Sequence, residues 1–222
     1  MPKAVIFDVD GTLVDTVDLH AACWVEAFAH FGVETAFEAV RGQIGKGGDQ
    51  LMPVFLPPEM LQRQGEAIDA FRGELYKSRY MPRARPFAGV RALFERLRAD
   101  GQWVVLASSG KEDEVEHYQD LLDIKDLVEA ATTSDDAERS KPHPDIFKAA
   151  LARIAPLTPM DAVVVGDTPY DAEAALKAGV RAVGVLCGGF PEADLRQAGC
   201  VAIYRDPEDL LRRYEESPLS RG

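Results

Sequence analysis

Residues 4–15 read AVIFDVDGTLVD, so that Asp8 and Asp10 come directly after four apolar residues. A continuous apolar run that ends near a turn residue such as Gly11 is typical of a strand buried on both faces of a parallel sheet. Residues i and i+2 of a strand point to the same side, so both carboxylates would face the crevice beyond the strand end, where open α/β sheets bind ligands. The stretch therefore predicts the first strand of an α/β fold with a candidate ligand site at its end.

Two alternative interpretations of this stretch, a surface turn and a calcium loop, have less support. Asp and Gly are also ordinary residues of surface turns, but turns rarely follow so apolar a run. A calcium loop counted from Asp8 needs Gly at its sixth position and Glu at its twelfth, and the chain has Leu13 and Leu19 there. Two carboxylates that point into one crevice repel each other, so a cation or a shared proton is expected between them.

The composition limits the classes of partner. The chain has 222 residues, enough for one large core or a core with a small second domain. Its formal net charge of −12 disfavours nucleic acid and membrane surfaces as partners, and an anionic substrate would need a local binding device. No apolar run approaches the ~20 residues of a membrane span, and the chain enters a strand at once, so we expect no membrane segment and no signal peptide. Three cysteines without metal-binding spacing fit a reducing compartment, so we expect a cytoplasmic protein (Cys23, Cys187 and Cys200). The sequence does not decide between a monomer and a homodimer.

Strands and helices alternate through most of the chain. Apolar runs that predict further strands lie at 103–107, 127–131, 162–165, 180–186 and 201–203. Segments with helical spacing or helix-terminal residues lie between or after them, at 90–99, 111–122, 144–154, 172–178 and 207–214. This alternation predicts an α/β fold with a parallel sheet that helices cover on both faces.

One block breaks the alternation. Residues 17–83 contain four helical segments and no strand pattern, the longest of them at 58–80. We therefore predict a core formed by residues 1–16 and 84–222, with 17–83 as an inserted all-helical cap. Linkers near Thr16 and Pro82 would join the two, and such an insert can act as a lid.

Polar residues at three later positions complete a possible phosphoryl-transfer site. Ser108 and Ser109 follow the strand at 103–107, Lys141 lies in Lys-Pro-His-Pro before a helix, and Gly-Asp-x-x-x-Asp follows the strand at 162–165. Phosphoryl transfer needs a nucleophile, charge neutralisation and a proton donor. Asp8 could attack phosphorus, Asp10 could serve as acid and base, and the hydroxyls of the serines could bind phosphate oxygens. Taken singly, the serines could equally be a turn and helix cap, and a lone lysine is usually solvated surface.

Together these motifs resemble the haloacid-dehalogenase-like hydrolases. Asp-x-Asp-Gly-Thr, the Ser after the second strand, Lys-Pro-x-Pro-x-x-Phe and Gly-Asp-x-x-x-Asp occur in that family's order across the core. The resemblance implies a Rossmann-like core with a helical cap, attack by Asp8, an aspartyl-phosphate and hydrolysis with Mg²⁺. It also implies a metal site of Asp8, Asp167 and the backbone carbonyl of Asp10, with Asp171 as an orienter or a ligand through water. Lys141 would neutralise the phosphate, and Thr12 of the first motif joins the candidate phosphate-binding residues.

Asp10 narrows the choice within the family. Relatives that cleave carbon–halogen bonds lack this second aspartate, and phosphonatases have a small residue there. The helical insert also resembles that of the phosphoglycolate phosphatases and β-phosphoglucomutases. We therefore expect a phosphatase for a small phosphorylated metabolite, of phosphoglycolate or sugar-phosphate type. The alternatives are a hexose-phosphate mutase and, further off, a phosphonatase or a non-catalytic binding protein on the same fold.

Two cap residues are candidate substrate contacts. His20 resembles a histidine that the mutases have on the hinge side of the site, although it could equally be one face of a helix. Lys46 lies in the loop IGKGGD at 44–49, which we expect to reach the substrate. This loop is neither a dinucleotide fingerprint nor a Walker loop, because Gln50 replaces the last Gly of the first and no Ser or Thr follows the Lys of the second.

Overall fold

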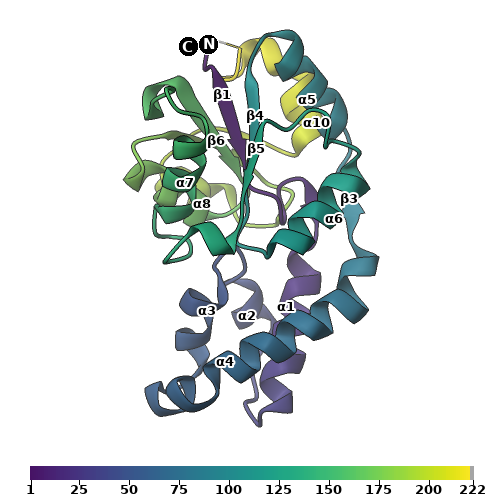
Figure 1. Cartoon of the computed structure of the whole chain (residues 1–222), viewed down its shortest axis with the longest axis vertical. Coiled ribbons are helices and arrows are strands. Elements are labelled where there is room, and N and C mark those ends of the chain that lie inside the picture. The colour runs from purple at the N-terminus through teal and green to yellow at the C-terminus, as the bar shows by residue number, and fades with distance from the viewer. Residues whose placement is uncertain (221–222) are drawn as a thin grey trace.

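The apolar run at the start of the chain is β1 (Ala4–Phe7), the inner strand from which the sheet extends both ways. The computed structural model describes residues 1–220 and contains a six-stranded parallel sheet of order β5-β4-β1-β6-β7-β8 (Figure 1). The other strands are β4 (Trp103–Ala107), β5 (Ala130–Thr132), β6 (Ala162–Gly166), β7 (Arg181–Val185) and β8 (Cys200–Tyr204). Ala4 pairs with Trp103 on one side and Ala162 on the other, so the carboxyl ends of the three central strands lie at one edge.

Both faces of β1 are covered, which explains its unbroken apolar sequence. Val5 and Phe7 belong to the core on one face, whereas Ala4 and Ile6 belong to the core on the other. Helices α5 (Val90–Ala99), α6 (Glu112–Leu122) and α10 (Pro207–Arg212) contribute to the first core, and α7 (Asp145–Arg153) and α8 (Pro169–Lys177) to the second. Figure 1 shows α5 and α10 on one side of the strands and α7 and α8 on the other. The predicted α/β fold with helices on both faces is confirmed.

The helical region follows the first strand, as expected. It consists of α1 (Val17–His30), α2 (Phe37–Arg41), α3 (Gly48–Phe55) and α4 (Pro58–Leu75), continued by a π-helix at Tyr76–Tyr80 and a 3₁₀ turn at Met81–Arg83. It has an apolar core of its own, in which Trp24, Phe28 and Leu51 pack together with Ile68. In Figure 1 this region extends beyond the carboxyl edge of the sheet, away from the chain termini. Among residues 1–220, none of the helices combines the length and apolarity needed to cross a membrane.

The prediction missed three short elements. Strands β2 (Val14–Asp15) and β3 (Arg85–Pro86) pair antiparallel where the helical region joins the sheet, and two residues are too few for a periodic pattern. Helix α9 (Glu192–Gln197) has one buried residue, so its sequence shows no apolar stripe. Helix α8 begins at Pro169, three residues before the predicted start, because the Thr168 hydroxyl accepts a hydrogen bond from the amide of Asp171 and caps it.

Candidate active site

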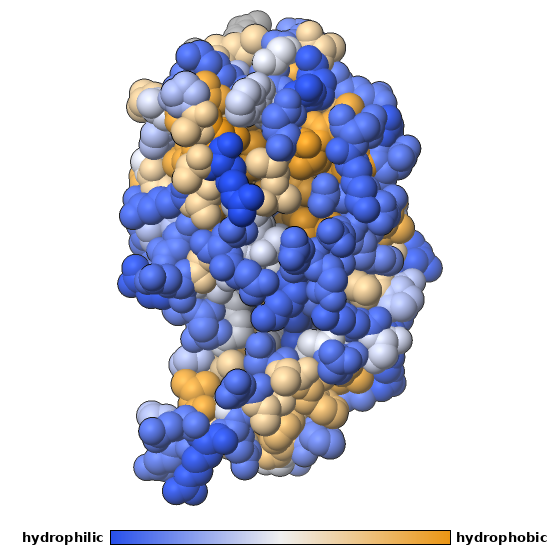
Figure 2. Space-filling model, viewed as in Figure 1, coloured by the Kyte–Doolittle hydropathy of each residue, from blue (hydrophilic) through white to orange (hydrophobic). Residues whose placement is uncertain are grey.

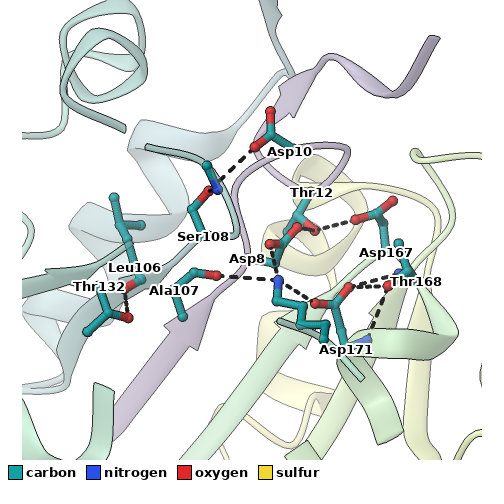
Figure 3. Close-up of polar contacts among 12 residues, drawn as sticks. Asp8, Asp10, Thr12, Leu106, Ala107, Ser108, Thr132, Asp167, Thr168 and Asp171 are labelled. Atoms are coloured by element: carbon teal, nitrogen blue, oxygen red, sulfur yellow. Dashed lines mark hydrogen bonds and ion pairs between the residues drawn. The ribbon is translucent and has the colours of Figure 1, made fainter. Parts of the chain in front are cut away.

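The predicted site residues of the core meet at the carboxyl edge of the sheet. Asp8 follows β1, Ser108 follows β4 and Asp167 follows β6, as the parallel register requires. Figure 3 shows Asp8 and Thr12 facing Asp167 and Asp171, while Asp10 and Ser108 lie together on the other side of Asp8. The site therefore has two halves with Asp8 between them.

Lys141 lies between two of these carboxylates. Its ammonium group contacts Asp8 Oδ1 and lies 2.8 Å from Asp171 Oδ1, and all three side chains are buried. Burial alone would lower the pKa of Lys141, but Asp171 and Asp8 raise it above its ordinary value. Burial raises the pKa of Asp8 to about 7, with Lys141 acting in the opposite direction. The lysine therefore stays charged and offsets part of the negative charge around Asp8.

Three carboxylates form a possible metal site. Single oxygens of Asp8, Asp167 and Asp171 lie within 4.8 Å of one another. The Thr12 hydroxyl lies 3.2 Å from Asp8 Oδ2 and 2.9 Å from Asp167 Oδ1, so it links the first of the four motifs to the last. Asp167 Oδ2 is buried and has no hydrogen-bond partner in the part of the chain that the structure describes. A buried carboxylate oxygen in that state is costly unless a cation binds it, so these oxygen donors fit Mg²⁺.

The backbone around Asp167 leaves no room for larger residues. A Cβ atom added to Gly188 would lie 1.7 Å from Asp167 Oδ2, and one added to Gly11 would lie 2.4 Å from the same oxygen. Burial, together with Asp8 and Asp171, raises the pKa of Asp167 well above its ordinary value. A cation in contact with these oxygens would reverse that shift, which supports the fit of a metal to this cluster.

Asp10 has a different environment. Its Oδ1 accepts hydrogen bonds from Thr16 Oγ1 at 2.8 Å and His20 Nε2 at 2.8 Å. Arg72 lies 2.5 Å from His20 Nδ1, and because a guanidinium only donates, Nδ1 accepts and the proton of a neutral ring lies on Nε2. Burial would raise the pKa of Asp10, but His20, Thr16 and Arg72 outweigh it and lower the pKa. The Asp10 side chain therefore lies outside the metal cluster, and only its backbone carbonyl remains as the ligand that the sequence predicts.

The loop after β4 faces Asp10. Ser108 is buried, and its hydroxyl lies 3.5 Å from Asp10 Oδ2 and accepts a hydrogen bond from the Gly110 amide at 2.9 Å. Ser109 lines the adjoining cavity. Both serines thus follow β4 at the carboxyl edge of the sheet, and phosphate binding by them stays a prediction.

A cavity of about 360 Å³ lies between this loop and the helical region. Lys46 is on its wall, as predicted, but its Nζ donates to Gln43 Oε1 at 2.6 Å and lies 4.5 Å from the centre of the Tyr170 ring. Tyr170 in turn donates to the Gly42 carbonyl at 2.6 Å. The loop therefore reaches the site while its lysine is held by neighbouring side chains.

Sequence reasoning missed three residues around the site. Thr16 and Arg72 fix Asp10 and His20, and Glu114 of α6 lies opposite Arg72 with Oε1 3.8 Å from the guanidinium. Arg72 and Glu114 are 42 residues apart and each is one charged residue in an amphipathic helix, so no spacing signal connects them. Thr16, four residues beyond the end of the first motif, was the one local signal available.

Comparisons with known proteins agree with this geometry. A family model described as haloacid dehalogenase-like hydrolase matches residues 5–185. The chain is 31% identical over 221 residues to a phosphoglycolate phosphatase of Cereibacter sphaeroides, covering 94% of this chain and 97% of that protein. It is 26% identical over 218 residues to a phosphorylated carbohydrates phosphatase of Thermotoga maritima, covering 96% and 99%. The crystal structure of a hydrolase from Pseudomonas syringae matches with a TM-score of 0.86 and 29% identity, over 96% of this chain and 98% of that one. The chain therefore belongs to the haloacid dehalogenase-like hydrolases, in the group of the phosphoglycolate phosphatases and β-phosphoglucomutases.

Proposed function

We propose that this chain is a Mg²⁺-dependent phosphatase that hydrolyses a small phosphate monoester, of phosphoglycolate or sugar-phosphate type, through an aspartyl-phosphate. The observation that carries the proposal is that two neighbouring carboxylates have different contacts on opposite sides of the site. Asp8 contacts Lys141 and belongs to the cluster of three carboxylates, whereas Asp10 accepts hydrogen bonds from Thr16 and His20 on the other side. Such a division suits one nucleophile and one acid–base group.

The proposed reaction has two steps. In the first, an Asp8 oxygen forms a bond to phosphorus, the bond from phosphorus to the ester oxygen breaks, and Asp10 gives a proton to the leaving alkoxide. Asp10 is ionised in the resting site, and the incoming phosphate dianion raises its pKa so that it takes that proton from solvent before the first step. In the second, water attacks the phosphorus of the phosphoenzyme, Asp10 takes a proton from the water, and the Asp8 carboxylate is released.

Charge neutralisation comes from Lys141 and from the metal. Asp8, Asp167 and the backbone carbonyl of Asp10 would hold Mg²⁺, with Asp171 orienting Lys141 at 2.8 Å. When bound, Mg²⁺ neutralises charge on the phosphoryl oxygens. Ser108 and Ser109 would bind the phosphate oxygens at the start of α6.

The helical region would act as a cap. We propose that residues 17–83 close over a core of 1–16 and 84–222, with the β2–β3 pair at the junction. The loop at 44–49 supports this role, because a Cβ added to Gly45 would lie 2.6 Å from Thr168 and Asp49 accepts a hydrogen bond from the Ser140 amide at 3.1 Å. These contacts describe a closed cap over a small cavity.

The mutase alternative has less support. A mutase holds a second phosphate on a basic cap group, and Lys46, the candidate for it, is bound to Gln43 and Tyr170. The names of the two curated relatives, a phosphoglycolate phosphatase and a phosphorylated carbohydrates phosphatase, also favour hydrolysis.

The experiment measures phosphate release from a panel of phosphate monoesters, with Mg²⁺ and with a chelator. We expect turnover only with Mg²⁺, and a loss of about 10⁴-fold or more in kcat for Asp8→Asn, because that change removes the covalent nucleophile. Asp120→Asn, an exposed aspartate of α6, is the matched control and should behave as wild type. Circular dichroism checks that both variants fold. More than a few per cent of wild-type activity in Asp8→Asn would contradict the assignment.

A further inference from the structure

On the cavity walls away from the reacting carboxylates, acidic side chains outnumber basic ones. Apart from Asp8 and Asp10, six carboxylic residues line the cavity against three cationic ones. The acidic set is Asp49, Glu66, Asp69, Glu114, Asp135 and Glu138, and the cationic set is Lys46, Arg72 and Lys111. On the face seen in Figure 2, the band between the sheet and the helical region is hydrophilic. A substrate that binds here places its non-reacting end among carboxylates.

The three cations already have contacts. Arg72 donates to His20 and lies 3.8 Å from Glu114 Oε1, and Lys46 donates to Gln43. Lys111 lies 4.0 Å from Asp135. A second anionic group of a substrate would therefore compete with existing partners of each cation.

Glu114 is the most unusual residue of this wall. It is 1% exposed, and neither carboxylate oxygen has a hydrogen-bond partner among residues 1–220. Burial raises its pKa, and the charge of Arg72 opposes that shift. The Nε of Arg72, whose Nη1 lies 3.8 Å from Glu114 Oε1, is also buried and lacks an acceptor within the described chain. Two acceptors on Glu114 of α6 and one donor on Arg72 of α4 thus lack hydrogen-bond partners in neighbouring side chains.

A hydroxyl group can satisfy both sides of this pair, since it donates one hydrogen bond and accepts others. A carboxylate or a second phosphate would instead lie beside Glu114 and Asp69 with no proton to share, and an ammonium group would lie beside Arg72. Buried polar atoms without partners are costly, so a ligand that provides both kinds of contact binds best.

We propose that the non-reacting end of the substrate is uncharged and carries hydroxyl groups, which donate to Glu114 and accept from Arg72. The assignment rests on the phosphatase function proposed above and narrows its substrates to polyol or sugar phosphates. Phosphorylated acids, phosphoglycolate among them, and bisphosphates are then poor substrates. Glu114 and Arg72 act as specificity-determining residues.

The test uses two esters with the same three-carbon skeleton. Glycerol 3-phosphate ends in a hydroxymethyl group, and 3-phosphoglycerate ends in a carboxylate at the same position. We expect kcat/KM of the wild-type enzyme with Mg²⁺ to be about ten- to a hundredfold higher for glycerol 3-phosphate. Equal values, or a preference for the carboxylate, would overturn the proposal.

A pair of variants tests the role of Glu114. Glu114→Gln keeps the shape but replaces one acceptor by an amide that can donate to a carboxylate, so the preference between the two esters should fall towards unity. Glu116→Gln changes the same charge at an exposed position of α6 and should keep the wild-type preference. An unchanged preference in Glu114→Gln, or the same change in both variants, rules out the assigned role.

Binding separates this proposal from the proposed function. Calorimetry of the two esters with Asp8→Asn, which should not turn over, reports the preference without hydrolysis. If the wild type hydrolyses no ester but glycerol 3-phosphate binds more tightly, the proposed phosphatase activity is wrong and the proposed substrate preference is supported. If both esters are hydrolysed and bound equally well, the function stands and the specificity fails.

Discussion

Asp8 and Asp10 show how two identical residues in one turn acquire different chemistry. Burial next to Asp171 raises the pKa of Asp8 to about 7 despite Lys141, whereas hydrogen bonds from His20 and Thr16 lower that of Asp10. The difference arises from which side of the crevice each carboxylate faces. It leads to two predictions at the scale of single residues.

Replacing Asp10 tests its acid–base role. Asp10→Asn removes the proton donor for the leaving group, so kcat should fall about 10²- to 10⁴-fold for a sugar phosphate. The loss should be much smaller for p-nitrophenyl phosphate, whose leaving group needs no proton. Steady-state kinetics with both esters measure the two losses. A similar loss on both would place Asp10 in binding or folding instead.

The effect of Mg²⁺ on stability should depend on pH. The raised pKa values of Asp8 and Asp167 mean that the folded protein binds more protons than the unfolded chain above about pH 4, so the metal-free protein loses stability as pH rises towards about 7. Mg²⁺ binds the deprotonated carboxylates and restores that stability. We therefore expect Mg²⁺ to raise the melting temperature more at about pH 8 than at about pH 5.5. Thermal melts at matched ionic strength measure this, and equal shifts at both pH values would argue against metal binding by this cluster.

At the scale of elements, the loop between α2 and α3 fits closely against the core. Gly45 has a positive φ of 101°, and a Cβ there would lie 2.6 Å from Thr168 Cγ2. A Cβ added to Gly47 would lie 2.0 Å from Ser140 Oγ. The close approach of this loop depends on glycine, so a side chain there should hold the helical region away from the core.

Gly45→Ala and Gly32→Ala separate closure from backbone strain. Gly32 also has a positive φ, of 80°, but nothing lies within 4 Å of its Cβ position. Each change should cost about 1 kcal/mol of stability, because alanine is strained at positive φ. Only Gly45→Ala should lower kcat/KM, by about tenfold or more, because it blocks the closed geometry that positions the substrate. Thermal melts and kinetics measure the two effects, and equal kinetic losses in both variants would exclude a role for loop contact.

Three of the four polar motifs were predictable in position because each directly follows an apolar strand, whereas the Lys141 motif precedes a helix. Parallel strands end at one edge, so Asp8, Ser108 and Asp167 had to meet once the strands were identified. Arg72 and Glu114 were not predictable, since their contact depends on how α4 packs against α6 across two parts of the molecule. The position of Lys46 on the cavity wall followed from its glycine-rich loop, but its contact with Tyr170 arises only when that loop docks on α8.

At the scale of the whole molecule, a net charge of −12 opposes the approach of any phosphate ester. Under the proposed function, Lys141, the metal and the serines before α6 would offset this repulsion close to the reacting phosphate. The rim of the cavity, formed in part by the exposed residues Asp49, Glu66 and Asp135, is negatively charged and therefore adds to the repulsion of a phosphate. The rate of substrate entry should therefore depend on ionic strength, and charges on the rim should affect that rate more than the net charge of the protein does.

Salt should speed the capture of substrate. The Debye length falls from about 30 Å at 0.01 M to about 8 Å at 0.15 M, so added salt screens the repulsion between the rim and a phosphate dianion. We expect kcat/KM to rise about twofold or more over this range, and to rise further for an ester with a carboxylate tail. Glu66→Gln removes a rim charge from α4 and should flatten the dependence, whereas Glu216→Gln removes an exposed charge that does not line the cavity and should not. Kinetics in potassium chloride measure the slopes. A rate that falls with salt, or equal slopes in the two variants, would mean that local cations dominate entry and that the acidic rim has no part in substrate selection.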